Sequence, residues 1–172
     1  GMDQMMADIV SMGGELFVMD DGWFGDKYPR KNDSSSLGDW VVDKNKLPNG
    51  IEGLLSDAKK HGVKFGIWIE PEMANTTSEL YEKHPDWVLK ASERDVVLGR
   101  GGTQVVLDLA NPAVQDFVFG VVDNLMTSYP EIDYIKWDAN MSVQNHGSQY
   151  LTKDNQSHMY IEFHRGFEKI CQ

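Results

Sequence analysis

Residues 134–140 read Tyr-Ile-Lys-Trp-Asp-Ala-Asn, a short apolar run that passes into charged and polar side chains. Such a run is typical of a strand buried on both faces, as in a parallel sheet covered by helices. Because alternate residues of a strand share a face, Lys136, Asp138 and Asn140 are predicted to point the same way. Polar groups gathered there are costly in a core but useful where a strand end opens into a site. We therefore expect the rest of the chain to form the walls of a pocket that Asp138 faces.

Composition and charge limit the classes of protein to which this chain can belong. It has 172 residues and a net charge of −11, so nucleic acid and anionic membrane surfaces are unfavourable partners. No run approaches the roughly 20 apolar residues of a membrane span. No basic segment precedes an apolar one as in a secretory signal, which predicts a cytoplasmic location. The single cysteine, Cys171, excludes a disulfide framework and a Cys-based zinc site.

Apolar runs alternate with amphipathic segments along the chain. Helices are expected at 2–12, 51–61, 80–84, 111–128 and 156–170, and strands at 16–19, 63–69 and 134–140. Between them lie a long loop at 24–49, a small hairpin of 87–89 with 96–98, and a further apolar run at 105–107. This alternation predicts βαβ units with a parallel sheet, an α/β fold built as one domain over residues 1–172.

Carboxylates follow the ends of the expected strands: Asp20, Asp21, Glu70, Glu72 and Asp138. Parallel strands present their carboxyl ends at one edge, where sites are built. One interpretation is a divalent metal site, since hard cations take oxygen ligands. Another is glycoside hydrolysis, which needs a carboxylate beside the anomeric carbon and a second carboxyl group across it. A third is structural pairing, for example of Glu70 or Glu72 with a lysine.

Tryptophans between the carboxylates favour a sugar, because their flat faces pack against ring C–H groups. They are Trp23, Trp40, Trp68 and Trp137. Trp40 lies in the long loop after a glycine and an aspartate, where it offers a stacking surface for substrate. Lys136 lies beside Asp138, and a nearby cation lowers the pKa of a carboxylate and keeps it ionised, as a nucleophile must be.

Four motifs occur in an order that resembles a known family. They are Asp-Asp-Gly-Trp-Phe-Gly at 20–25, Gly-Asp-Trp at 38–40, Gly-Ile-Trp-Ile-Glu-Pro-Glu at 66–72 and Lys-Trp-Asp-Ala-Asn at 136–140. Together they resemble the bacterial alpha-galactosidases of glycoside hydrolase family thirty-six, and the resemblance covers nearly the whole chain. It implies a partial (β/α)8 TIM barrel, roughly its second to fourth βα units, with parallel strands and flanking helices.

The resemblance also implies roles for individual residues. Asp138, the aspartate of the Lys-Trp-Asp motif, is expected to be the nucleophile of a retaining reaction on terminal alpha-galactosyl residues of oligosaccharides. Other positions are expected to bind or enclose the sugar: Asp20, Asp21, Trp68, Arg100, Lys136 and Asn140. Neither a metal nor an organic cofactor is expected.

The sequence departs from the family pattern after Asp138. In the family the acid/base aspartate follows on a later strand, whereas this chain ends one helix beyond Asp138. We therefore expect a fragment with little activity alone, whose open sheet edges or inner face lead to self-association. The alternatives are a non-catalytic sugar-binding or assembly half-barrel, and a metal-dependent barrel enzyme that uses the acidic strand ends.

Overall fold

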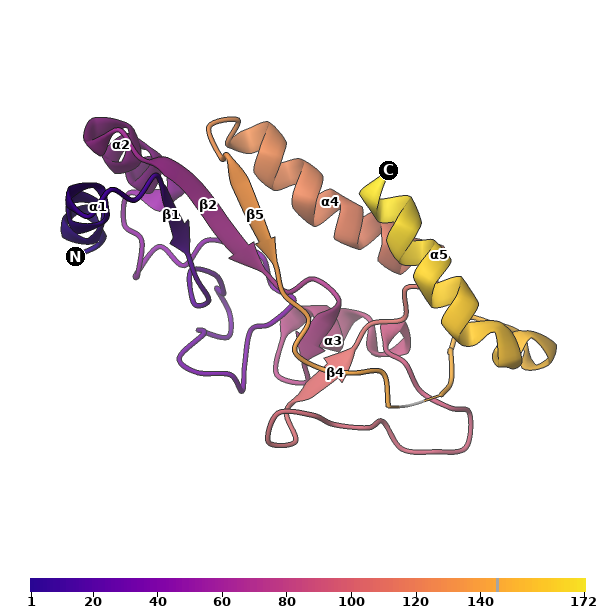
Figure 1. Cartoon of the computed structure of the whole chain (residues 1–172). Helices are drawn as coiled ribbons and strands as arrows, with labels where there is room; N and C mark the ends of the chain where they lie inside the picture. The colour runs from indigo at the N-terminus through magenta and orange to yellow at the C-terminus, as the bar shows by residue number, and fades with distance from the viewer. Residues whose placement is uncertain (145) are drawn as a thin grey trace.

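A computed structural model describes residues 1–144 and 146–172 as a parallel sheet flanked by helices, with a smaller strand pair beyond the sheet's end (Figure 1). The helices are α1 (Met2–Ser11), α2 (Gly50–His61), α3 (Glu79–Lys83), α4 (Pro112–Ser128) and α5 (Met159–Cys171). The strands are β1 (Leu16–Met19), β2 (Lys64–Ile69), β3 (Met73–Asn75), β4 (Gln104–Val106) and β5 (Tyr134–Trp137), with 3₁₀ turns η1 (Pro85–Trp87) and η2 (Lys153–His158).

The parallel sheet consists of β1, β2 and β5, with β2 in the centre. Its register pairs Phe17 with Phe65 and Ile67 with Ile135. The helix α2 lies between β1 and β2 in the chain, and α4 lies between β2 and β5, which is the βαβ arrangement that the sequence predicts. All three arrows point toward α3 and β4 (Figure 1). The carboxyl ends of the strands therefore meet at one edge.

Local signals in the sequence fix the ends of the two connecting helices. The side chain of Asn111 accepts a hydrogen bond from the Ala113 amide at 3.0 Å, and Pro112 takes the first helical position of α4. The helix α2 ends at Gly62, whose φ of 69° lies in the left-handed region that glycine adopts without strain. These boundaries match the sequence prediction and set where β2 and β5 begin.

The apolar run at 105–107 belongs to a second sheet that the alternation does not predict. β4 pairs antiparallel with β3, and Met73 lies opposite Val106. The three residues of β3 carry too short a pattern to stand out in the sequence. The carboxylate that follows this run, Asp108, is fully buried and accepts a hydrogen bond from the Ser148 hydroxyl at 2.5 Å. It is therefore a structural group, separate from the edge of the parallel sheet.

The hairpin predicted between 87–89 and 96–98 is wrong. Val88 bridges to Leu107 instead, and Gly99 bridges to Gln104. Val88 thus finds its partner in the segment around β4, whereas residues 96–98 form no strand or bridge. A short apolar run can indicate an extended segment, but it does not identify the segment with which it pairs.

Two clusters of buried apolar side chains hold the elements together. The first includes Leu54 of α2 and Phe65 of β2, and the second includes Val105 of β4 and Phe163 of α5. Trp137, the last residue of β5, packs against both clusters. The strand end that carries the predicted nucleophile is therefore fixed from two sides. No helix in the described part of the chain is long and apolar enough to cross a membrane.

The close approach of α5 to the segment before α4 depends on Gly166. A Cβ added there would collide with the backbone oxygen of Leu109 and crowd the Gln115 amide. We expect Gly166→Ala to lower the free energy of unfolding by about 1–3 kcal/mol, because overpacking against backbone outweighs the better helix propensity of alanine. Chemical denaturation of the purified protein measures this.

Gly120 provides the matched control for that substitution. It lies within α4, where an added Cβ meets nothing within 4 Å. Gly120→Ala should therefore raise the free energy of unfolding by about 0.5–1 kcal/mol through helix propensity alone. Equal effects of the two substitutions would contradict the packing described for α5.

Candidate active site

The three parallel strands each end at a carboxylate. Asp20, Glu70 and Asp138 are the first residues after β1, β2 and β5. The register pairs the last residues of β2 and β5, so Glu70 and Asp138 lie level, and it places Trp68 level with Lys136. Because alternate residues share a face, these side chains project from the same face of the sheet. The strand ends thus converge on one site, as the sequence predicts.

The Asp138 carboxylate is held mainly through one oxygen. Its Oδ2 accepts hydrogen bonds from Trp68 Nε1 at 3.0 Å and from Asn140 Nδ2 at 2.7 Å. Among the described residues, Oδ1 accepts only the Ala139 amide, at 3.1 Å. Burial raises the pKa of Asp138, but these three hydrogen bonds and the charge of Lys136 outweigh it and leave the pKa below its usual value. Asp138 is therefore an ionised carboxylate with one anchored oxygen and one less engaged oxygen.

Glu70 lies beneath Asn140 and is only 1% exposed. Its Oε1 accepts hydrogen bonds from the Asn140 backbone amide at 2.7 Å and from Asn140 Nδ2 at 2.9 Å. Burial raises the pKa of Glu70 above its usual value, although both bonds from Asn140 act to lower it. A carboxyl group so covered cannot touch a substrate directly.

The suggested pairing of the glutamates with a lysine is wrong. Glu70 bonds to Asn140, and Glu72 Oε2 accepts a hydrogen bond from Trp137 Nε1 at 3.0 Å. Both carboxylates thus accept hydrogen bonds from N–H groups that lie at or just after the end of β5. The lysines of the same and the neighbouring strand, Lys64 and Lys136, suggest a charge pair in the sequence, but the sequence does not show that such an N–H group lies closer to each carboxylate.

Lys136 extends across the face of the sheet to Asp20. The distance from Lys136 Nζ to Asp20 Oδ2 is 3.2 Å, and the two side chains are 43% and 67% exposed. An ion pair this exposed contributes little to stability, about 0–1 kcal/mol. Its charged groups therefore remain open to a ligand lying over the strand ends.

Asp21 has a partner that the sequence analysis missed. Arg30, from the long loop, donates to both Asp21 oxygens, from Nε at 2.9 Å and from Nη2 at 2.6 Å. Its Nη1 donates to the Ser35 carbonyl at 2.9 Å and to Asn75 Oδ1 at 3.0 Å, and only 3% of its side chain is exposed. Arg30 thus ties the loop to the end of β1. Nothing in the local sequence around Arg30 marks it as buried.

An aromatic cluster lies behind the predicted nucleophile. Trp68 is buried, and its backbone oxygen accepts a hydrogen bond from Trp23 Nε1 at 2.9 Å. The ring centroid of Trp40 lies 6.1 Å from that of Trp68 and 4.6 Å from that of Phe24. Trp40 therefore supports the ring that bonds to Asp138, and the stacking of a sugar on Trp40 stays a prediction.

Arg100 lies on a glycine-rich turn near the site. Its φ of 46° is uncommon for a residue other than glycine. The guanidinium lies 3.5 Å from Asp33 Oδ2, and 40% of the side chain is exposed. Its positive charge also acts to lower the pKa of Glu70. Arg100 therefore adds positive charge to the surroundings of Glu70, and its contact with substrate stays a prediction.

The strand-end carboxylates are engaged by N–H donors and by a lysine. Among the described residues, no group of three His, Cys, Asp or Glu side chains is placed to hold a metal ion.

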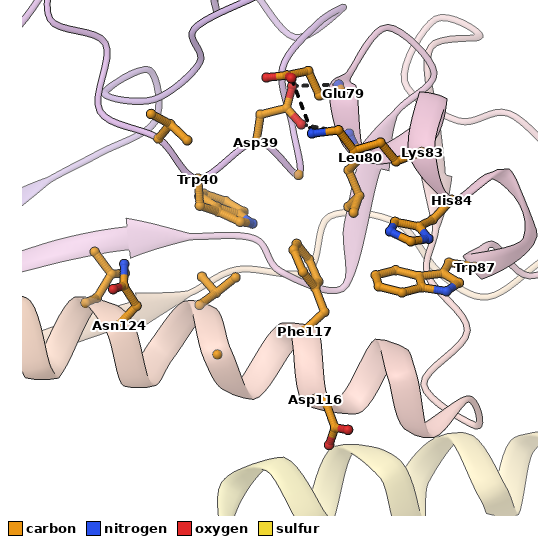
Figure 2. Close-up of a pocket in the computed structure, with 15 residues that line it drawn as sticks. Asp39, Trp40, Glu79, Leu80, Lys83, His84, Trp87, Asp116, Phe117 and Asn124 are labelled. Atoms are coloured by element: carbon orange, nitrogen blue, oxygen red, sulfur yellow. Dashed lines mark hydrogen bonds and ion pairs between the residues drawn. The ribbon is translucent and has the colours of Figure 1, made fainter.

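A cavity of about 520 Å³ lies elsewhere, between the loop at 38–41, α3 and α4 (Figure 2). Asp39 projects there, but its carboxylate accepts the backbone amides of Glu79 at 2.9 Å and Leu80 at 3.0 Å, at the start of α3. Asp116 points away from the cavity (Figure 2). The Asp39 carboxylate serves as a helix cap. The better candidate for an active site is therefore the strand edge around Asp138, where several polar side chains converge.

The geometry at that edge agrees with the comparisons with known proteins. The melibiase family model matches residues 2–171. The chain belongs to the melibiase family. This melibiase chain is 44% identical over 147 residues to the probable alpha-galactosidase C of Aspergillus flavus, an alignment that covers 81% of the chain and 19% of that protein. It therefore spans about a fifth of the length of this curated relative.

Solved structures of the melibiase family share the fold. The alpha-galactosidase of Lactobacillus brevis superposes with a TM-score of 0.90 at 39% identity, over 98% of this chain and 22% of that one. A variant of the family 36 alpha-galactosidase AgaA of Geobacillus stearothermophilus, in complex with raffinose, gives a TM-score of 0.90 at 38% identity. This alignment covers 98% of this chain and 23% of that one. The α/β architecture of parallel strands and flanking helices thus matches a part of the family 36 barrel, as the sequence predicts.

Proposed function

We propose that these residues form the part of a retaining alpha-galactosidase that binds the terminal galactosyl group and carries the nucleophile, Asp138. The observation that carries this proposal is the state of the Asp138 carboxylate. It is ionised, it is anchored at Oδ2 by two donors, and its Oδ1 is less engaged. A carboxylate held in this way can attack a carbon without first losing a proton.

The proposed reaction follows the retaining scheme. Asp138 Oδ1 attacks the anomeric carbon, the glycosidic C–O bond breaks, and the departing oxygen takes a proton from a second carboxyl group. Water then attacks the galactosyl ester, gives its proton to that second group, and releases galactose and the free carboxylate. Glu70 is excluded as this second carboxyl group by its burial.

The proposed sugar contacts come from the exposed groups over the strand ends. Lys136 donates to a sugar hydroxyl and Asp20 accepts from one, because their ion pair is solvent-exposed. The complex of AgaA with raffinose supports a galactosyl oligosaccharide as the substrate of this protein. Arg100 and Trp40 stay candidates for further contacts with the sugar.

Chromogenic glycosides test the proposed function most simply. The full-length gene product that contains these residues should hydrolyse the p-nitrophenyl alpha-galactoside and leave the beta-galactoside and the alpha-glucoside essentially untouched. Binding of galactose without turnover would favour a non-catalytic sugar-binding role instead. Turnover of the beta-anomer alone would contradict the proposal.

We also propose that this chain, taken alone, associates with itself through its sheet. Among the described residues, β1 and β5 each pair on one side only, and Tyr134 on β5 is 50% exposed. Unpaired strand edges are templates for further pairing. Sedimentation velocity of the 172-residue chain should show dimers or larger species, and Tyr134→Lys should reduce them. A strictly monomeric, compact species would contradict this.

A further inference from the structure

Asn140 connects two carboxylates at the edge of the sheet. Its Nδ2 donates to Asp138 Oδ2 at 2.7 Å and to Glu70 Oε1 at 2.9 Å. Both hydrogens of the side-chain amide are used in these two bonds. The amide oxygen is then the group of Asn140 that remains available to a ligand.

The orientation of this amide depends on what lies beneath it. A carboxylate without a proton only accepts hydrogen bonds, so Glu70 Oε1 selects the nitrogen side of the amide and repels the oxygen side. The same oxygen also holds the Asn140 backbone amide at 2.7 Å, which fixes the main chain from which the side chain projects. A turned amide would place its oxygen against both carboxylates at once.

We propose that Glu70 is a positioning residue for the reaction assigned above. By accepting both N–H groups of Asn140, it turns the amide so that Nδ2 holds the Asp138 carboxylate and the amide oxygen faces the substrate. Glu70 acts through Asn140, because its own burial keeps it from the sugar. This inference rests on the proposed function, since it assigns Glu70 a part in the same catalytic step.

Two substitutions separate the acceptor role of Glu70 from simple packing. Glu70→Leu removes the acceptor, and we expect kcat on a chromogenic alpha-galactoside to fall about 10- to 100-fold, as for the loss of a charge-assisted hydrogen bond. Glu70→Gln keeps an oxygen that can face Asn140 and should recover part of that loss. Equal losses in both variants would overturn the proposal.

The neighbouring glutamate of the same Glu-Pro-Glu motif is the matched control. Glu72 bonds to the Trp137 indole at 3.0 Å and makes no described hydrogen bond to Asn140 or Asp138. Glu72→Gln should therefore change kcat by less than about 3-fold, within the range of a peripheral neutral contact. A loss as large as that of Glu70→Leu would show that the motif acts through general packing, which overturns the proposal.

A double-mutant cycle tests whether Glu70 acts through Asn140. If it does, most of the loss of kcat caused by Glu70→Leu should disappear in the Asn140→Ala background, which lacks the amide. Glu70→Leu introduced into Asn140→Ala should therefore lower kcat by less than about a further 3-fold. Independent, multiplying losses in the double variant would overturn the proposal. Asn140 is exposed, so its alanine variant should fold, and the cycle stays informative if Glu70→Leu alone is unstable.

A structural measurement separates this inference from the proposed function. In a crystal structure of the full-length Glu70→Leu variant the Asn140 amide should turn or move, so that its 2.7 Å contact with Asp138 is lost or shared between two orientations. In Glu70→Gln, whose amide oxygen can still accept from Asn140, this contact should be kept more fully than in Glu70→Leu. An unchanged contact in both variants overturns the positioning role whether or not the protein hydrolyses galactosides. A wild-type protein without activity overturns the proposed function, and with it the catalytic part of this inference.

Discussion

Asp138→Ala should lower kcat for alpha-galactoside hydrolysis by at least about 1,000-fold, because removing a nucleophile abolishes the covalent route and leaves only the contribution of binding. The loss should fall on kcat far more than on KM. The groups that hold the sugar, such as the exposed Lys136 and Asp20 pair, remain in place in this variant.

Added azide should restore part of the activity of Asp138→Ala. The small anion fits the space that the carboxylate leaves and attacks the anomeric carbon from the same side, so the product should be the beta-galactosyl azide. Formation of the alpha-azide, or no effect of azide on a folded variant, would contradict the role of Asp138 as the attacking group.

The opposite end of the same strand offers a matched control. Asp133 precedes β5, and its Oδ2 accepts the Phe65 amide at 3.0 Å. Asp133→Asn should keep kcat within about 3-fold and lower the free energy of unfolding by about 1 kcal/mol, the usual loss for one weakened hydrogen bond. A large loss of activity in Asp133→Asn would mean that β5 is simply sensitive to any change of charge.

The pH dependence follows from the environment of Asp138. Burial raises the pKa of Asp138, but the hydrogen bonds from Asn140, Trp68 and Ala139 and the charge of Lys136 lower it by more, so that the net pKa lies below its usual value. The reactive ionised form therefore persists to a lower pH than it does in a free aspartate. The acidic limb of kcat/KM should accordingly lie at a lower pH than the titration of a free aspartate.

Arg30→Ala should lower the free energy of unfolding by about 3–5 kcal/mol, the usual loss when one partner of a buried ion pair is removed. The guanidinium is 3% exposed and donates to both Asp21 oxygens and to Asn75. Without it, Asp21 loses its counter-charge and the long loop loses its tie to β1. Denaturant unfolding measures the change.

Two further variants sharpen that measurement. Arg30→Lys keeps the charge but cannot donate two parallel hydrogen bonds, so it should fall between wild type and Arg30→Ala. Lys27→Ala breaks an exposed pair with Glu82, in which the side chains are 54% and 43% exposed, and should change stability by less than about 1 kcal/mol. Equal losses in Arg30→Ala and Lys27→Ala would contradict the account of the loop.

The sequence correctly predicts those parts of the fold that depend on residues close together in the chain. The buried run before Asp138, the Asn111-Pro112 start of α4 and the glycine at the end of α2 each act within a few residues. They are sufficient for the order of helices and parallel strands. The face shared by Lys136 and Asp138 follows in the same way, from the alternation of side chains along one strand.

The parts that the sequence analysis missed depend on partners distant in the chain. β3 pairs with β4 across about 30 residues, and no period in either segment identifies the other. Arg30 appears as one more polar residue of a loop, yet it is buried against Asp21 and Asn75. The Glu70 contact with Asn140 joins residues 70 positions apart. Contacts of this kind form because a buried acceptor bonds to the donor that the tertiary fold places next to it, and that donor can come from any part of the chain.

The central claim, that Asp138 is the nucleophile, is tested most directly by trapping the galactosyl intermediate. A fluorinated alpha-galactoside with a reactive leaving group, which forms the ester faster than water removes it, is incubated with the full-length gene product, and the digested protein is analysed by mass spectrometry. We predict one galactosyl adduct, located on Asp138. An adduct on another residue, or turnover of the substrate with inversion of the anomeric centre and no adduct, would contradict the claim.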